Sequence, residues 1–392
     1  MPWKETCAMD ERLRFIADWL DGRWSKSDLC RGYGISRPTV DKWIERYQAE
    51  GVEGLKERSR APHHQRDALG DELVQRIIKL REQYPTFGPA KLRLILEDRH
   101  PGERLPAASS IGVVLKKAGL VVSRKRKPRA CSSATPCDRS ESSNHVWCAD
   151  FKGTLYAGDG CPCSPLTISD DYSRFLLGCQ GMRRTHGTSV QAVFEQVFRA
   201  NGMPGIIRTD NGPPFASVGL GGLTRLAVWW IRLGIEPQRI EPGRPEQNGR
   251  HERMHRTLKD WLKHYPSKNY IQLLKQLDRF VEEYNWERPH QALGQTVPAA
   301  SYQRSVCVFP GRLPEMDYDG SFQVRRVKRH GEISWKGRRW YLSEALAGER
   351  IGLLERDERY MEVYLGEFRL GLLDCKRKDV VRAKRLEKAG TE

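Results

Sequence analysis

The sequence predicts a chain of several domains, with helical units at the amino end, an α/β domain in the middle and a small all-β unit at the carboxy end. Apolar residues recur at helical spacing within residues 8–122, strand and helix patterns alternate within 144–303, and short alternating runs occupy 318–375. A chain of 392 residues has room for two to four domains, each with its own core. We therefore expect a multidomain protein with a mixed α/β centre.

Residues 8–56 are expected to form three helices in a helix-turn-helix arrangement. Asp10 and Ser36 are suitable caps for the first and third helices, and the chain turns at Gly32 to Gly34 between the second and the third. The outer face of the third helix offers side chains that contact phosphates and base edges, namely Arg37, Thr39, Lys42 and Arg46. An ordinary three-helix packing module is the alternative, because the tryptophan-rich core fits both.

Residues 68–122 repeat this pattern and predict a second helix-turn-helix domain. Between the two domains, residues 57–66 carry prolines, histidines and arginines with no period, which is typical of a linker. A basic and serine-rich segment, 123–143, follows the second domain. It begins with a cationic run, Arg124, Lys125, Arg126 and Lys127, which fits both a solvated linker and a DNA-contacting arm.

The central domain, 144–303, is expected to gather three carboxylates. Strands are predicted at 146–151, 165–169, 175–178 and 205–209, and helices at 189–200, 223–233 and 246–262. Asp150 and Asp210 stand at the ends of two buried strands, and Glu246 follows a proline in the first turn of a helix. Two strand ends and one helix start can converge on one point, whereas three unrelated surface acids are the alternative.

The chemistry of clustered carboxylates points to divalent metal ions. Neighbouring carboxylates repel unless cations neutralise them, and hard oxygen ligands select Mg²⁺, with Mn²⁺ as the second choice. Two ions held ~3.5 to 4 Å apart activate a water or a DNA 3′-hydroxyl and stabilise the leaving oxygen of an in-line displacement at phosphorus. We expect Asp150 to bridge the two ions, with Asp210 and Glu246 each completing one coordination sphere.

The sequence around these acids resembles that of retroviral integrases and related bacterial insertion-sequence transposases. Thirty-five residues separate Asp210 from Glu246, as in the family's Asp-Asp-Glu triad, and the segment 284–293 with Pro298 is similar to the family's tail motif. The resemblance implies a ribonuclease H-like catalytic core over 144–303. In the similar segment 169–175, it implies a structural role for Asp171 instead of metal binding.

Further basic residues are expected to contact DNA. Arg250, Arg253 and Lys259 follow Glu246 along one side of its helix, where a phosphate backbone would pass. The last domain, 318–375, has the pattern of a small antiparallel barrel and resembles the carboxy-terminal barrel of the same family. Its basic face carries Arg325, Arg326 and Lys328, and a basic tail, 376–392, extends it. Of two adjacent tryptophans, Trp230 is expected in the core and Trp229 partly exposed, with stacking on a DNA base as the alternative.

Composition favours DNA as the partner. The formal charge is +17 and the pI near 9.5, and release of counterions gives basic proteins much of their affinity for DNA. No apolar stretch approaches the ~18 residues that span a bilayer, and no secretory signal is recognisable, so we expect a cytoplasmic protein that does not bind membranes. The ten cysteines are scattered and include no Cys-x-x-Cys pair, so we expect reduced thiols and no zinc.

These observations lead to one functional hypothesis and two alternatives. The hypothesis is a transposase that uses two Mg²⁺ ions to cut mobile-element ends and join their 3′-hydroxyls to target DNA, acting as a homodimer or a larger assembly. The first alternative is a metal-dependent nuclease with the same core that only hydrolyses DNA. The second is an inactive relic that still binds DNA.

Overall fold

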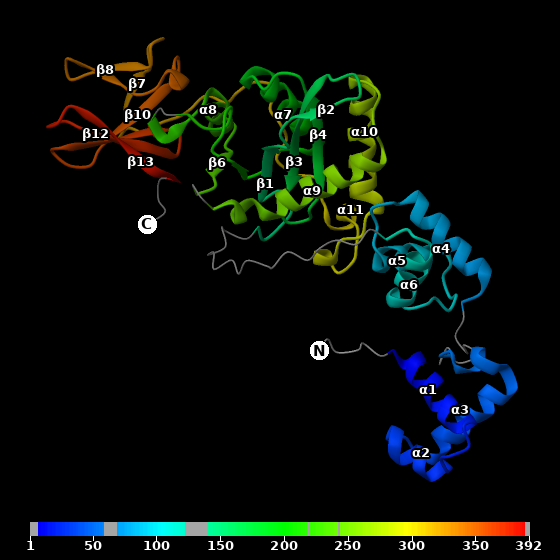
Figure 1. Ribbon diagram of the computed structural model, residues 1–392. Helices are drawn as coiled ribbons and strands as arrows, with labels where there is room; N and C mark the ends of the chain where they lie inside the picture. The colour runs from blue at the N-terminus through cyan, green and yellow to red at the C-terminus, as the bar shows by residue number, and fades with distance from the viewer. Residues whose placement is uncertain (1–6, 59–68, 122–139, 218–219, 242–243, 389–392) are drawn as a thin grey trace. The chain divides into compact units, whose positions relative to one another are not determined.

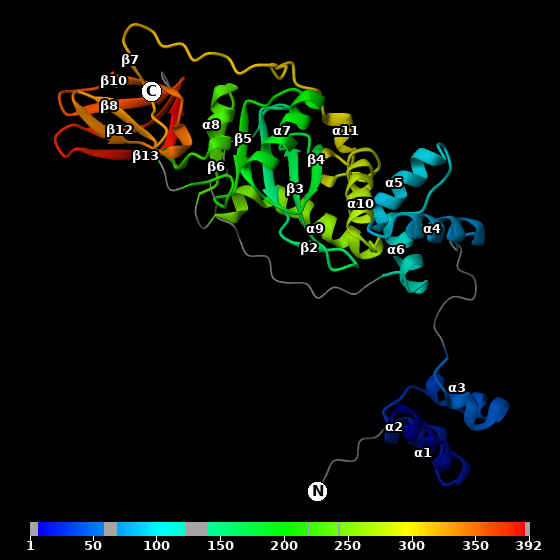
Figure 2. The same cartoon turned by 90° about the horizontal axis from the view of Figure 1, so that it is seen from above.

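The computed structural model describes residues 7–58, 69–121, 140–217, 220–241 and 244–388, without the side chains of 245–246 and 382–388. Two compact units are present, 1–69 and 70–392. Figure 1 shows the order of the helices and strands along the chain, and Figure 2 shows them in a second view. The first unit is helical, and the second contains all of the sheets.

The first unit contains α1 (Ala8–Leu20), α2 (Lys26–Tyr33) and α3 (Arg37–Glu50), followed by the 3₁₀ helix η1 (Gly51–Leu55). Ser25 caps α2 by accepting a hydrogen bond from the backbone N–H of Asp28, and Gly34 ends that helix in the left-handed conformation. Phe15, Ile16, Leu29, Val40 and Ile44 are buried together. The predicted helix-turn-helix is confirmed, and Leu13 and Leu20 of its first helix are exposed.

The second unit begins with three more helices, α4 (Asp71–Gln83), α5 (Pro89–Arg99) and α6 (Ala108–Lys117). Their buried residues, including Ile77, Leu92 and Ile111, recur at helical spacing, as the sequence predicts. The cationic run at 124–127 and most of the predicted linker lie outside the described residues.

A mixed sheet forms the centre of the second unit. Its strands are β1 (Val146–Phe151), β2 (Leu155–Tyr156), β3 (Pro162–Asp170), β4 (Leu176–Met182), β5 (Ile206–Thr209) and β6 (Glu236–Arg239). The order is β2-β3-β1-β5-β6, with β4 paired to β3. β1 runs antiparallel to β3 but parallel to β5, and β5 runs parallel to β6. Antiparallel strands followed by parallel strands are the order expected for a ribonuclease H-like core.

Helices cover both faces of this sheet. On one face α7 (Gly187–Asn201) and α8 (Arg225–Arg232) bury an apolar cluster that includes Trp147, Ile168, Phe194 and Phe198. On the other face, α9 (Gly249–His264) and α10 (Tyr270–Glu282) bury Cys163, Cys179, Trp261 and Phe280, among others. Trp230 and Trp229 of α8 are both buried, so the expected partial exposure of Trp229 is wrong. Packing in the core accounts for both tryptophans.

The segment between β6 and α9 differs from the prediction. A 3₁₀ helix, η3 (Pro245–Asn248), comes first, and the α-helix begins only at Gly249. Glu246 therefore lies in η3 and not in the first turn of the α-helix. The chain after α10 continues through the π-helical turn η4 (Glu283–Glu287), the 3₁₀ turn η5 (Gln291–Leu293) and the short helix α11 (Pro298–Ser301).

The carboxy-terminal part is an open sheet, and the predicted closed barrel is not confirmed. β7 (Gln323–Arg326), β10 (Arg350–Glu355), β11 (Tyr360–Leu365), β12 (Phe368–Asp374) and β13 (Asp379–Lys388) form the order β13-β12-β11-β10-β7. β8 (Glu332–Trp335) and β9 (Arg338–Tyr341) form a separate hairpin, and the 3₁₀ turn η6 (Glu344–Leu346) follows it. β7 and β13 stay at opposite edges, so the ladder does not close. Residues 379–388, expected in a tail, form β13 because they pair with β12.

In the described part of the chain, no helix is both long enough and apolar enough to cross a bilayer.

Candidate active site

Asp150 and Asp210 lie at the same edge of the central sheet. β1 and β5 are parallel and in register, with Ala149 opposite Thr209, so the next residue of each strand is an aspartate. The turn after Asp210 is tight, because a side chain at Gly212 would place its first carbon 3.0 Å from Asp210 Oδ2. Asn211 ties this turn to the end of β6 by donating a hydrogen bond to the Ile240 carbonyl, at 2.7 Å. The sequence prediction that two strands deliver these two acids to one place is consistent with this geometry.

The negative charge of Asp210 acts on Asp150. The pKa of Asp150 is raised to about 7, chiefly by burial and next by the negative charge of Asp210. In Asp210, Oδ1 is buried and has no hydrogen-bond partner among the described residues. A buried acceptor without a donor is unfavourable unless a cation satisfies it. This edge of the sheet therefore favours a positive charge between the two carboxylates.

Glu252 is a further acid near this edge. It lies in the first turn of α9, its residue is exposed, and its charge contributes to the raised pKa of Asp150. The side chain of Glu246 lies outside the described residues. Sequence reasoning passed over Glu252, because the 35-residue spacing pointed to Glu246.

Two buried histidines of α9 lie behind Asp150. Burial lowers the pKa of His251 to about 3 and, together with the charge of His251 and of Lys152, that of His255 to about 2. His255 Nδ1 is 3.8 Å from Asp150 Oδ2. Both imidazoles are within 2.7 Å of the Thr167 hydroxyl on β3. The sequence signal for this cluster was available, since two histidines four residues apart share one helix face.

The residues at this edge fit a hard divalent cation. They supply carboxylate oxygens, one of which is buried without a partner, and their mutual repulsion would be relieved by a positive ion. Among the described side chains, no set of three or more His, Cys, Asp and Glu is close enough to hold a metal alone. At the ends of β1 and β5, the described side chains that suit such an ion are the carboxylates of Asp150 and Asp210.

The predicted DNA-contacting residues of the first unit lie on α3. Arg37 and Lys42 are exposed, while Thr39 and Arg46 are half-buried. The cationic groups of Lys42 and Arg46 lie 5.1 and 5.2 Å from the ring centroid of Trp43. Thr39 shares a 2.9 Å hydrogen bond with the hydroxyl of Ser36. This helix face thus presents cations to solvent.

Along α9, Arg253 and Lys259 are exposed, but Arg250 is engaged elsewhere. Its Nη1 forms a 2.7 Å ion pair with Asp171, which also accepts a hydrogen bond from Ser140. The neighbouring Asp170 accepts bonds from the backbone and hydroxyl of Ser173. These contacts support the structural role expected for Asp171, and they orient Arg250 within the protein.

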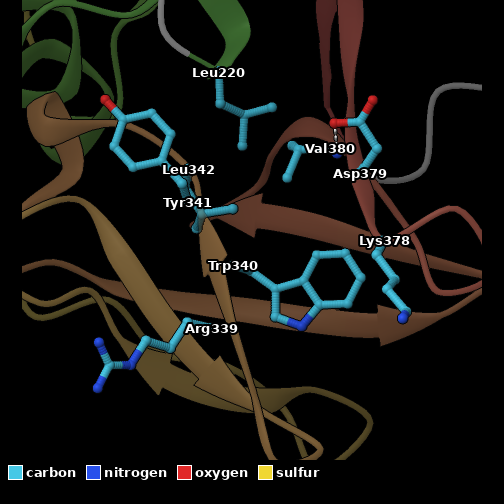
Figure 3. A pocket seen from close by; sticks show the side chains of 8 residues that line it. All are labelled: Leu220, Arg339, Trp340, Tyr341, Leu342, Lys378, Asp379 and Val380. Carbon is cyan, nitrogen blue, oxygen red and sulfur yellow. Dashed lines mark hydrogen bonds between the residues drawn. The ribbon is translucent and has the colours of Figure 1, made fainter.

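In the carboxy-terminal sheet, the predicted contacts Arg325, Arg326 and Lys328 lie on or just after β7. Arg326 and Lys328 are exposed, and Arg325 is half-buried. The loop that follows Asp210 reaches this region, where Leu220 donates a backbone hydrogen bond to Leu342. A cavity of about 250 Å³ lies at this junction. Leu220, Tyr341 and Lys378 are among the residues that line it (Figure 3).

The tail motif, 284–293, binds the helices at the start of the second unit. Tyr84 donates a 2.6 Å hydrogen bond to Glu287, and Arg288 donates a 2.9 Å bond to Thr86. The guanidinium of Arg288 also lies 5.0 Å from the ring centroid of Phe87. The motif therefore holds the turn between α4 and α5 against the core.

Family models match most of these parts separately. An integrase core domain matches residues 140–245, and a second model of that description matches 233–298. A helix-turn-helix domain matches 11–63, and a homeodomain-like domain matches 39–115. The C-terminal domain of the IS481 family of transposases matches 322–381.

Relatives at low identity span much of the chain. A 31.7 kDa protein of insertion element IS407 from Burkholderia multivorans is 24% identical over 303 residues, which cover 74% of this chain and 96% of that protein. The transposase InsD of insertion element IS2 from Escherichia coli is 22% identical over 298 residues, which cover 71% of this chain and 94% of that protein. The catalytic core domain of HTLV-2 integrase, solved in complex with magnesium, is 17% identical to this chain. The match covers 42% of this chain and 100% of that domain, with a TM-score of 0.35.

Proposed function

We propose, from the premise that the chain belongs to the insertion-sequence transposases with an integrase-type core, that it cuts the ends of a mobile element and joins them to target DNA. The observation that carries this proposal is the pairing of Asp150 with Asp210 at one sheet edge, where burial and the charge of Asp210 raise the pKa of Asp150 and Asp210 Oδ1 is buried without a hydrogen-bond partner among the described residues. The helix-turn-helix units make DNA the partner. Its terminal repeats and a target duplex are the proposed substrates.

Asp150 and Asp210 would hold Mg²⁺, or Mn²⁺ in its place, and two ions are proposed once DNA is bound. When bound, the metal activates a water or 3′-hydroxyl and stabilises the leaving oxygen at phosphorus. The exposed cations of α9, Arg253 and Lys259, would hold the DNA backbone beside the carboxylates.

The third carboxylate comes from the segment that leads into α9, where there are two candidates. Glu246 has the 35-residue spacing from Asp210 and lies in η3. Glu252 lies in the first turn of α9, and its charge acts on Asp150. The spacing makes Glu246 the proposed third ligand, and the electrostatic effect makes Glu252 the alternative. Two matched variants, Glu252→Gln and Glu246→Gln, distinguish them, because only the ligand should lose strand transfer by roughly 10³-fold or more.

The proposed reaction is tested with purified protein, Mg²⁺ and labelled DNA ends taken from the sequences that flank its gene. Joined products support the proposal, and Asp210→Asn should abolish them while end binding persists. Cut but unjoined ends would indicate a nuclease that only hydrolyses. Binding without any change in the DNA would indicate an inactive relic, and either result would overturn the proposal.

At least two protomers are proposed, because two element ends have to be brought together for joining. Analytical ultracentrifugation of the protein with and without end DNA measures this directly. A complex with one protomer for two ends would contradict it.

A further inference from the structure

Thr167 is the centre of a buried polar cluster beneath Asp150. It lies on β3 directly opposite Asp150 of β1, and it is fully buried. Its hydroxyl oxygen is 2.9 Å from the carbonyl oxygen of Asp150 and 2.7 Å from Nε2 of both His251 and His255. One hydroxyl group therefore meets three partners at hydrogen-bond distance.

The number of protons determines the direction of these three bonds. A hydroxyl has one hydrogen to donate and two lone pairs that accept. The Asp150 carbonyl has no hydrogen, so the hydroxyl of Thr167 donates to it. Both lone pairs of Thr167 are then left for the two imidazoles, and each Nε2 has to carry a hydrogen.

The positions of these hydrogens leave both Nδ1 atoms without one. Both imidazoles are buried, burial disfavours the charged form of a side chain, and a neutral imidazole has a single N–H. The bare Nδ1 of His251 accepts a hydrogen bond from the hydroxyl of Ser169, at 2.9 Å. The bare Nδ1 of His255 faces Oδ2 of Asp150, at 3.8 Å. The imidazole nearest to Asp150 thus presents a lone pair and not a donor.

We infer that Thr167 is a positioning residue for the proposed metal site, because its hydroxyl fixes the tautomers of His251 and His255 so that neither N–H is directed at Asp150. This inference rests on the proposed function. A donor from His255 would occupy a carboxylate lone pair and compete with a cation for it. With both N–H groups bound to Thr167, Asp150 Oδ2 stays available to a positive ion.

A matched pair of variants isolates the hydroxyl. Thr167→Val keeps the branched shape but removes the acceptor, so the hydrogen of His255 is released to move to Nδ1 and bond to Asp150. Thr167→Ser keeps the hydroxyl and serves as the control. Residues behind metal ligands typically change metal affinity about 10- to 100-fold, so we expect Thr167→Val to weaken Mg²⁺ binding at least tenfold and Thr167→Ser to leave it nearly unchanged.

Two measurements test the inference on the full chain. Nitrogen NMR of protein labelled in histidine should show the Nε2–H tautomer for His251 and His255 in the wild type and in Thr167→Ser. In Thr167→Val the signal of His255 should change to the Nδ1–H form. Assignments follow from the signals lost in His251→Asn and His255→Asn. Calorimetric titration with Mg²⁺ gives the affinities without relying on any reaction.

The possible results separate this inference from the proposed function. An Nδ1–H tautomer at either histidine of the wild type overturns the inference, and this holds even if Thr167→Val does not fold. Equal Mg²⁺ affinity in the wild type and Thr167→Val also overturns it. Absence of joined DNA products from a wild type that binds Mg²⁺ and shows both expected tautomers would count against the transposase reaction and leave the role of Thr167 intact.

Discussion

The two faces of the central sheet bury very different side chains. Under α7 and α8 the cluster is apolar and rich in aromatic rings, and the ring of Phe198 packs against four others. Under α9 the sheet buries Thr167, Ser169, His251 and His255, next to the apolar residues that anchor α10. Burial of apolar surface stabilises the first face, whereas each polar group on the second needs a hydrogen-bond partner.

This difference shows where the fold accommodates chemistry. Strand alternation sends Trp147 and Ala149 to the apolar face and leaves Cys148 and Asp150 for the face of α9. The apolar face can therefore be optimised for packing while the other positions a carboxylate. Changes on the first face are expected to alter stability, and changes on the second to alter both stability and function.

The largest expected effect on stability is on the apolar face. Phe198 is fully buried, and Phe198→Ala should lower the free energy of unfolding by about 3–5 kcal/mol, because a cavity replaces a packed ring. Urea unfolding measures this, and strand transfer per folded molecule should stay unchanged. The exposed Val306 provides a control, since Val306→Ala should change stability by less than about 0.5 kcal/mol. A folded Phe198→Ala protein without strand-transfer activity would contradict the expectation that changes on the apolar face alter stability only.

The next largest effect on the free energy of unfolding is expected from two buried tryptophans, one on each face of the sheet. Trp261 of α9 donates a 2.7 Å hydrogen bond to the buried carboxylate of Glu283, whereas the indole N–H of Trp230 in α8 has no partner among the described residues. Trp261→Phe leaves Glu283 unsatisfied and should cost about 1–3 kcal/mol more than Trp230→Phe. Urea unfolding of both variants tests this, and equal losses would contradict it.

The two faces should also differ in their response to acid. Burial lowers the pKa of His251 to about 3 and that of His255 to about 2. Below pH ~6.5, both histidines are therefore protonated in the unfolded chain but remain neutral in the folded protein. Asp150 acts in the opposite sense, because its pKa of about 7 lets the folded state hold one proton that the unfolded state lacks above pH ~4. The unfolded state thus binds one more proton than the folded state. The free energy of unfolding should therefore fall by about 1.4 kcal/mol for each unit that the pH is lowered between roughly pH 6 and pH 4.

Urea unfolding of the metal-free protein at several pH values measures this loss. His251→Asn removes one of the two histidines and should make the profile nearly flat over the same range. A profile in the variant as steep as in the wild type would show that His251 does not contribute.

The smallest expected effect is on the exposed side of α9. Arg253→Ala and Lys259→Ala should leave stability unchanged and weaken DNA binding alike for all sequences, because both side chains are proposed to contact phosphates. Each should reduce the slope of log affinity against log salt by about 1. Fluorescence anisotropy across a salt series measures the slope. An unchanged slope would remove that residue from the DNA contact.

The sequence by itself determined the local elements and the placement of two acids. Caps, glycine turns and apolar periodicity located the helices of the first unit, and β1 occupies the predicted residues 146–151. Two acids directly after parallel strands had to meet at one edge, because register and direction fix that outcome. These features depend on neighbours along the chain, and residue patterns record them.

Only the tertiary structure decided which distant residues come together. The 35-residue spacing predicts Glu246 as the third acid, whereas only the folded structure shows that η3 precedes α9 and that the charge of Glu252 acts on Asp150. The hydrogen bonds of Thr167 join strands and a helix that are more than 80 residues apart. The pairing of β13 with β12 and the open edges of the last sheet are likewise properties of packing. Such contacts depend on distances through space, and spacing along a chain does not specify these once loops of free length intervene.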